Sequence, residues 1–179
     1  MTQVGINYGS SLYDLAKEEN ITEEILHQLH VLDASFGIEP AFLRLLSTPG
    51  LTKDERLKIL DESFRGNVHI YVLNFLKLLT EKGYARYFGD CRKAFEDRYN
   101  QDNGILPVLA VSAVALSESQ SEKLTEKLAQ ITGKKVKLSN RVDPSCLGGV
   151  RLRYDGNQVD GTVKNRLDTI GNLLKNTVL

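Results

Sequence analysis

Residues 142–163 read VDPSCLGGVRLRYDGNQVDGTV, and this stretch decides the fold of the second half of the chain. Gly148-Gly149 allows a sharp backbone turn. Apolar and basic residues then alternate from Val150 to Tyr154, which predicts a strand with one buried and one solvated face. Asp155-Gly156 predicts a tight hairpin, because both residues tolerate positive φ. The return strand runs from Gln158 to Asp160, so the stretch predicts a turn followed by a hairpin.

A helix is expected after this hairpin. The Thr162 hydroxyl can accept a hydrogen bond from a backbone N–H of the first turn, so Thr162 can act as the N-cap. The helix is expected to bury residues spaced by three or four, namely Val163, Leu167, Ile170, Leu174 and Val178.

The chain upstream supplies the other elements of the same domain. Residues 105–115 are continuously apolar and rich in Val and Ala, which predicts a mostly buried strand. Ser117 and Gln120 form a capping box that opens a helix. Val136 and Leu138 alternate with lysines in a further strand. The helix is expected to bury Leu124, Leu128 and Ile131. Residues 105–179 should therefore form a small α+β domain of four short strands and two helices.

Residues 1–104 carry a different pattern, in which apolar residues recur every three or four positions. Capping and breaker residues, among them Gly37, Pro40 and the box from Thr52 to Glu55, divide this pattern into six helical segments. The sixth segment is expected to bury Tyr84, Tyr87, Phe88, Cys91 and Phe95. The fold class predicted is an N-terminal six-helix bundle at residues 1–104, followed by the α+β domain at residues 105–179.

The fifth helical segment, at about residues 68–81, is apolar on almost all sides. Such a helix either lies in the centre of a bundle or exposes an apolar surface to a partner. Periodicity alone does not distinguish the two.

Composition is that of a globular protein, with 41% hydrophobic and 26% charged residues and a net charge of zero over 179 residues. The charge is unevenly distributed. Residues 1–104 contain 12 Lys and Arg against 16 Asp and Glu, a net charge of −4, whereas residues 105–179 contain 11 against 7, a net charge of +4. This asymmetry supports a boundary near residue 104 and indicates that the two halves face different partners.

The sequence favours a cytoplasmic protein. No apolar run approaches the roughly 20 residues that a membrane helix needs, and the N-terminus lacks the pattern of a secretory signal. Cys91 and Cys146 lie far apart without metal-ligand spacing, which fits a reducing compartment.

Candidate catalytic and metal-binding residues are few. His27 and His30 stand three apart on a helix, but no Cys or further His clusters with them, so a solvated or packed pair is favoured over metal ligation. Asp155 and Asp160 each precede a glycine in a turn, which explains their placement without acid–base chemistry.

The remaining candidates also have structural explanations. Cys91 lies on an apolar stripe and is expected in the core, whereas Cys146, beside a turn, is expected to be the more accessible thiol. Gly148-Gly149 lacks the spacing of phosphate-binding loops and is expected to be a structural turn. The basic residues of the second half form either a solvated sheet face or a binding patch. They are Lys135, Lys137, Arg151 and Arg153. No cofactor or metal is expected, and the chain has the character of an interaction protein.

Three separated motifs carry a family resemblance. The C-terminal one is Val142-Asp-Pro-Ser-x-Leu-Gly-Gly-Val-x-Leu followed by Val159-Asp-Gly-Thr-Val-x-x-Arg-Leu, the first is Asn7-Tyr-Gly-Ser-Ser-Leu-Tyr-Asp-Leu-Ala, and Leu76–Gly83 with Ser112–Leu116 lies in the middle. In this order they resemble the delta subunit of the rotary F-type ATP synthase, whose mitochondrial counterpart is the oligomycin-sensitivity-conferring protein. Thr162, Cys146 and Gly9 depart from the Ser, aliphatic residue and Ala that are usual in that family.

The resemblance implies a stator function without a cofactor, at the cytoplasmic face of the cell membrane. The expected partners are the alpha and beta subunits of the catalytic head and the b subunit of the peripheral stalk, with no nucleic acid and with membrane association only through the complex. A helix of an alpha subunit is expected between the first and fifth helices, at Tyr8, Ser11, Leu12, Leu76 and Leu79. The contact with b is expected near Gly148, Gly149, Arg151 and Arg153.

Two alternatives stay open. An RNA-binding or ribosome-associated module could use the basic sheet face, and its binding would fall steeply with salt. A small-molecule enzyme could use the loops from Gly148 to Gly161, which would require a concave pocket with convergent polar groups. A groove along the first and fifth helices, without such a pocket, would favour the stator.

Overall fold

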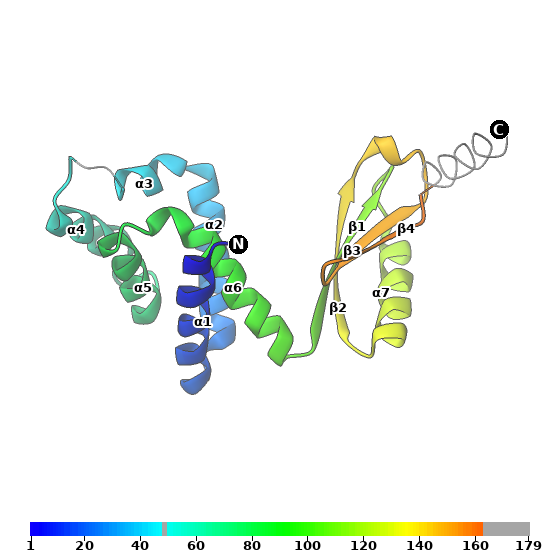
Figure 1. Ribbon diagram of the computed structural model, residues 1–179, viewed down its shortest axis with the longest axis horizontal. Coiled ribbons are helices and arrows are strands. Elements are labelled where there is room, and N and C mark those ends of the chain that lie inside the picture. Colours follow the sequence, from blue (N-terminus) through cyan, green and yellow to red (C-terminus); the bar gives the residue numbers. More distant parts are fainter. Residues whose placement is uncertain (48–49, 163–179) are drawn as a thin grey trace, which may run out of the picture. The chain divides into compact units, whose positions relative to one another are not determined.

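The computed structural model describes residues 1–47 and 50–162. The chain divides into two compact units, Met1–Tyr99 and Asn100–Leu179, and each has its own hydrophobic core (Figure 1). This division falls close to residue 104, where the net charge and the apolar periodicity both change.

Helices build the first unit. They are α1 Gln3–Glu18, α2 Thr22–Ile38, α3 Pro40–Leu45, α4 Lys53–Phe64, α5 Ile70–Glu81 and α6 Phe88–Asp102, with a short 3-10 turn at Ala85–Tyr87 before α6. Side-chain caps mark the starts of three of these helices, and at the first of them the Thr2 hydroxyl accepts from the N–H of Gly5 in α1. The Thr52 hydroxyl and the Glu55 carboxylate each accept a hydrogen bond from the other's backbone N–H, which confirms the predicted capping box of α4. The ring Nδ1 of His69 accepts from the N–H of Tyr71, so α5 begins slightly later than predicted.

The sixth helix is shorter than predicted. Gly83 adopts a left-handed φ of 73°, and the N–H of Tyr84 donates to the carbonyl of Leu79 over 2.7 Å. These features end α5 and start a separate 3-10 turn that contains Tyr87. Phe88 is therefore the first residue of α6, and the two tyrosines precede this helix.

Two glycines allow α1 to pack closely against α6. A Cβ at Gly9 would collide with the carbonyl of Cys91 and would lie 2.8 Å from the Cβ of Ala94. A Cβ at Gly5 would lie 2.5 Å from the Cβ of Asp90. The two glycines are about one helical turn apart, so they form a flat strip against the backbone of α6. This packing accounts for Gly9 at a position where the resembling family usually has Ala.

The second unit is a four-stranded mixed sheet with a helix on one face (Figure 1). Its elements are β1 Ile105–Ser112, α7 Glu118–Thr132, β2 Lys135–Val142, a 3-10 turn at Pro144–Cys146, β3 Val150–Tyr154 and β4 Asn157–Asp160. The strand order is β2-β1-β3-β4, with β1 parallel to β2 and antiparallel to β3, and with β3 antiparallel to β4. The helix α7 makes the crossover that a parallel pair requires. The α+β class predicted for this half is confirmed.

The core of this unit lies between the sheet and α7. Leu124 and Leu128 of α7 pack on the sheet as predicted, but Ile131 is 77% exposed, so its predicted burial is wrong. The strand residues of this core are Leu106, Val108, Val136, Leu138, Leu152 and Tyr154.

The first strand ends earlier than the predicted segment 105–115. The hydroxyl of Ser112 donates to the carbonyl of Val114 over 2.7 Å and closes a turn. The Asn140 side chain holds this turn, because it donates to Ser112 Oγ and accepts from the N–H of Leu116. The residues after Ser112 therefore leave the sheet.

The predicted hairpin is confirmed. Asp155 and Gly156 have φ values of 48° and 75°, and they connect Tyr154 and Asn157, which pair in register. The helix predicted from Val163 onward lies outside the described residues.

Candidate functional site

A groove of about 350 Å³ lies between α1 and α5 in the first unit. Four residues of each helix line it: Tyr8, Ser11, Leu12 and Leu15 from α1, and Tyr71, Asn74, Phe75 and Leu78 from α5. We call it the α1–α5 groove. Both sets have the spacing i, i+3, i+4 and i+7, which places four side chains on one face of a helix over two turns.

The two walls of the α1–α5 groove are chemically alike and run in opposite directions. Each presents a tyrosine, a polar residue, a buried apolar residue and a half-exposed leucine, in that order along the chain. Tyr8, in the first half of α1, packs edge-on against Tyr84, which follows the end of α5, with ring centroids 5.8 Å apart. The start of one wall therefore lies beside the end of the other.

The groove includes three of the five residues predicted for the alpha contact. Tyr8, Ser11 and Leu12 line it. Leu76 and Leu79 do not line it; these residues are 3% and 0% exposed and belong to the core. Their placement in the groove was wrong, since a helix that is apolar on almost all sides gives no periodic signal for its outward face.

The sequence also contains a signal for the correct face of α5. Asn74 is a polar residue inside the apolar run, and it marks the solvent side of the helix. Leu78 lies four residues further along and is 41% exposed. On α1, Leu15 is 39% exposed at the corresponding place. These residues, together with Tyr71 and Phe75, complete the groove.

None of the eight lining residues is charged. Two nearby cations are engaged with carboxylates instead. Lys77 Nζ lies 2.7 Å from Asp61 Oδ1, and Arg98 lies 2.9 Å from Asp14. The hydrogen bond from Lys77 lowers the pKa of the Asp61 carboxyl. The α1–α5 groove therefore suits an apolar, uncharged surface, such as one face of an amphipathic helix.

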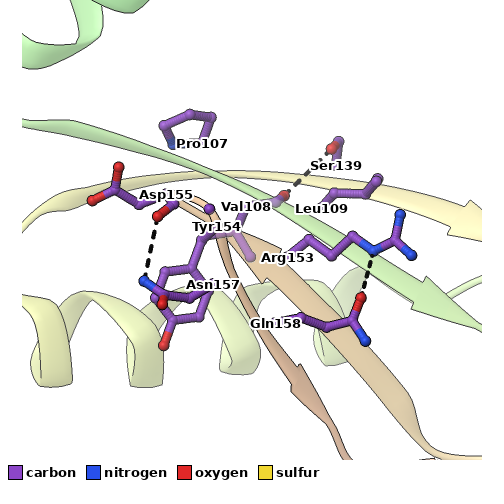
Figure 2. Close-up of a pocket in the computed structure, with 10 residues that line it drawn as sticks. Pro107, Val108, Leu109, Ser139, Arg153, Tyr154, Asp155, Asn157 and Gln158 are labelled. Carbon is purple, nitrogen blue, oxygen red and sulfur yellow. Dashed lines mark hydrogen bonds between the residues drawn. The ribbon is translucent and has the colours of Figure 1, made fainter.

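The second unit has a sheet face opposite α7, which we call the open face because α7 does not cover it; Val111 on this face is nevertheless 0% exposed in the described part of the chain. Alternation along the strands turns one set of residues toward α7 and the other set toward this face. In-register pairing places Ser139, Leu109, Arg153 and Gln158 in one row, and Arg141, Val111, Arg151 and Asp160 in the next. A cavity of about 500 Å³ lies along the first row and is bordered by the hairpin (Figure 2).

Polar groups in this cavity bond to their neighbours. The Nε of Arg153 donates to Gln158 over 2.9 Å, and the hydroxyl of Ser139 donates to the carbonyl of Val108 over 3.3 Å (Figure 2). These contacts hold the two side chains against the sheet.

The residues expected at the contact with b differ in their surroundings. Arg153 is exposed on the open face. Arg151 is half-buried, and its Nε donates to Asp160 over 2.8 Å. Hydrogen bonds from the Thr162 hydroxyl and N–H, followed by the one from Arg151, lower the pKa of Asp160 to about 2. Gly149 has a φ of 76°, and a Cβ there would lie 2.5 Å from the Gly161 carbonyl oxygen. Both features require glycine at this position, as expected for a structural turn.

His27 and His30 line neither the α1–α5 groove nor the cavity of the second unit. His30 Nε2 lies 3.4 Å from Glu96, and His27 is exposed. Within residues 1–47 and 50–162, no three His, Cys, Asp or Glu side chains are grouped so that they could hold a metal ion. The described helices also contain none that is long and apolar enough to span a membrane.

Both cysteines are buried. Burial raises the pKa of the Cys91 thiol to about 12, in agreement with its predicted place in the core. Cys146 is 0% exposed, so its predicted accessibility is wrong. The reason is the 3-10 turn at Pro144–Cys146, in which Asp143 accepts from the N–H of Ser145 and the chain folds the thiol inward.

The described residues thus form an uncharged groove between two helices in the first unit and a sheet face with several basic side chains in the second. The sequence matches the family described as ATP synthase delta (OSCP) subunit over residues 4–174. The chain belongs to this family, which confirms the resemblance carried by the three motifs.

Similar proteins match over nearly their whole length. The ATP synthase subunit delta of Clostridioides difficile (strain 630) is 33% identical over 172 residues, which are 96% of this chain and 95% of that protein. The corresponding protein of Moorella thermoacetica is 31% identical over 172 residues, 96% of each. A chain in the structure of the Toxoplasma gondii mitochondrial ATP synthase hexamer has the same fold, with a TM-score of 0.77 and 19% identity over 97% of this chain and 98% of that chain. These relatives give no support to the RNA-binding alternative.

Proposed function

We propose that this protein is the stator subunit that links the catalytic head of the F-type ATP synthase to the membrane-anchored b subunit of the peripheral stalk. It would prevent the head from turning with the rotor, so that rotation is coupled to ATP synthesis. The observation that carries the proposal is family membership over residues 4–174, with relatives that match over nearly their whole length. The contribution of the chain is binding, and it catalyses no reaction of its own.

Residues 1–104 act in this proposal as a six-helix bundle domain that holds the head. The N-terminal helix of an alpha subunit binds in the α1–α5 groove, and the beta subunits are further partners at the head. The groove supports this assignment because it is uncharged and extends over two helical turns. Leu15 and Leu78 are about two-fifths exposed, so a ligand that covers them removes apolar surface from water.

Residues 105–179 hold the stalk in this proposal. The open face binds the b subunit near Arg151 and Arg153 and the turn at Gly148-Gly149. The two rows of this face contain the basic residues Arg141, Arg151 and Arg153 and the single acidic residue Asp160, which favours a partner segment with acidic side chains. The protein is then peripheral to the cytoplasmic face of the cell membrane and is attached to it only through the complex.

Calorimetry with a peptide from the N-terminus of an alpha subunit, called the alpha peptide below, tests the groove. Leu78→Asp places a charge among apolar residues, and we expect binding to weaken by about 2 kcal/mol or more. Ile70→Asp is the matched control, because Ile70 belongs to the same helix, is 56% exposed and does not line the groove. Equal affinities of both variants and the wild type would exclude the groove as the head-binding site.

Co-purification from native membranes tests the function as a whole. Catalytic-head and stalk polypeptides should both be retained by the wild-type chain. Residues 1–104 alone should retain the head but not the stalk, whereas the full chain should retain both. This result would assign head binding to the first domain and stalk binding to the second. Loss of both partners from the wild-type chain would contradict the proposal.

A further inference from the structure

The α1–α5 groove contains two polar residues among apolar and aromatic ones. Ser11 and Asn74 occupy the same place in their two walls, next to the buried residues Leu12 and Phe75. Because the walls run in opposite directions, these two pairs lie at the middle of the groove, with a tyrosine and a leucine toward each end. Any polar contact made there is flanked by apolar contacts on both sides.

The two polar side chains differ in which hydrogen-bonding groups remain available to a ligand. The hydroxyl proton of Ser11 is used within α1, where it donates to the carbonyl of Asn7 over 2.9 Å. Asn74 is exposed, and the hydrogen bonds found in the described part of the chain include none to its side-chain amide. A primary amide carries two N–H donors and one carbonyl acceptor. Asn74 is therefore the principal polar recognition point of the groove.

Apolar contacts alone would position a helical ligand poorly in this groove. A shift by one helical turn moves a ligand helix about 5.4 Å and brings the next apolar side chain to the same place. The similar walls accept both positions, because each offers a tyrosine at one end and a leucine at the other. Covering Asn74 with an apolar side chain, however, would leave its amide without water or a partner, which is unfavourable.

We propose that Asn74 sets the register of the helix that binds in the α1–α5 groove. The ligand presents one neutral hydrogen-bonding side chain to the Asn74 amide, with apolar side chains three or four residues to either side and no charge on this face. This inference rests on the proposed function, in which the ligand is the N-terminal helix of an alpha subunit. A single buried Asn acts in the same manner in coiled coils, where it fixes alignment at some cost in stability.

A coupling experiment tests this assignment with an alanine scan of the alpha peptide. For the wild-type chain, we expect one neutral polar position on the apolar face of the peptide to cost about tenfold in affinity when replaced. With Asn74→Leu, the same replacement should cost less than about threefold, because its partner is gone. Asn7→Leu is the matched control, since Asn7 is exposed on α1 and does not line the groove.

Distance measurement reports the register directly. A spin label on one end of the peptide and another on an exposed position of the first unit should give one distance for the wild type. Asn74→Leu should broaden it to distances separated by about 5 Å, the rise of one helical turn. A merely structural role of Asn74 would leave this distribution narrow.

The outcomes separate this inference from the function on which it rests. If the wild type binds the peptide and Asn74→Leu retains both the tenfold cost and the single distance, the register assignment is wrong and the stator function stands. If the wild type does not bind the peptide, the proposed groove function fails and the assignment fails with it. Self-association that Leu78→Asp abolishes would identify a second copy as the occupant, and it would overturn the assignment too.

Discussion

The α1–α5 groove and the open face differ in the physics by which each can hold a partner. The groove consists of uncharged side chains on two helices whose other faces fill a core. The open face carries charged and polar side chains on both sides of the apolar residues Leu109 and Val111, and the other face of this sheet packs on α7. Binding in the groove should therefore depend on apolar area, and binding to the open face should depend on charge. In the proposed function, the two partners would therefore be held by different forces.

The largest expected effect is a difference in stability between substitutions on the two faces of α5. Leu76→Asp should lower the free energy of unfolding of the first unit by about 4 kcal/mol or more, because it places a carboxylate in a core that cannot hydrate it. Leu78→Asp should change it by less than about 1 kcal/mol, because that side chain already meets solvent. Urea denaturation followed by circular dichroism measures both. Equal losses would show that Leu78 also belongs to the core and that the groove is not a free surface.

The contact between α1 and α6 gives the next largest effect. Gly9→Ala should destabilise the first unit by about 1–3 kcal/mol, because the added methyl group collides with the Cys91 carbonyl. Gly37→Ala is the control, because Gly37 lies in α2 with nothing within 4 Å of an added Cβ. That variant should be neutral or more stable by up to about 1 kcal/mol. Thermal unfolding of both variants gives the comparison, and an unchanged Gly9→Ala protein would show that the helices can separate without cost.

Salt dependence sharpens the comparison between the two surfaces. Raising the salt concentration should weaken binding of a peptide from the C-terminus of the b protein and leave binding of the alpha peptide nearly unchanged. Arg153→Ala should weaken binding of the b peptide by about 0.5–1 kcal/mol at low salt and reduce its salt dependence. Titrations at two salt concentrations measure both quantities. If the affinity for the alpha peptide fell steeply with salt, or the affinity for the b peptide did not change, then apolar contacts would not dominate in the groove or charge would not dominate on the open face.

The smallest effect concerns pH and belongs to the open face. The pKa of Asp160 is lowered from 3.8 to about 2, so its carboxylate stabilises the folded unit above about pH 4. This stabilisation is lost as the pH falls through 2, because the proton then binds the folded state as well. Asp160→Asn should be less stable than the wild type at pH 5, and most of this difference should be gone near pH 2. Urea denaturation at these two pH values checks the sign, and a difference that persists at pH 2 would assign the effect to packing.

The sequence predicted local structure better than it predicted surfaces. The capping boxes at Thr52 and Ser117 and the hairpin at Asp155-Gly156 were correct, because neighbouring residues determine them. The outward face of α5 and the burial of Cys146 were wrong, because both depend on contacts with segments distant in the chain. Asn74 could have corrected the first error, since a polar residue in an apolar helix marks solvent. Cys146 offered no comparable signal.

The position of β1 bears on how the second unit would carry mechanical load. Only Asn103 and Gly104 separate the end of α6 from Ile105, and β1 lies between β2 and β3 in the sheet. All eight residues of β1 pair with β2, and its last four residues, Leu109–Ser112, also pair with β3. A pull along the β1 backbone would therefore load its pairing with β2 over the whole strand, so these hydrogen bonds would be sheared together instead of being peeled apart one at a time.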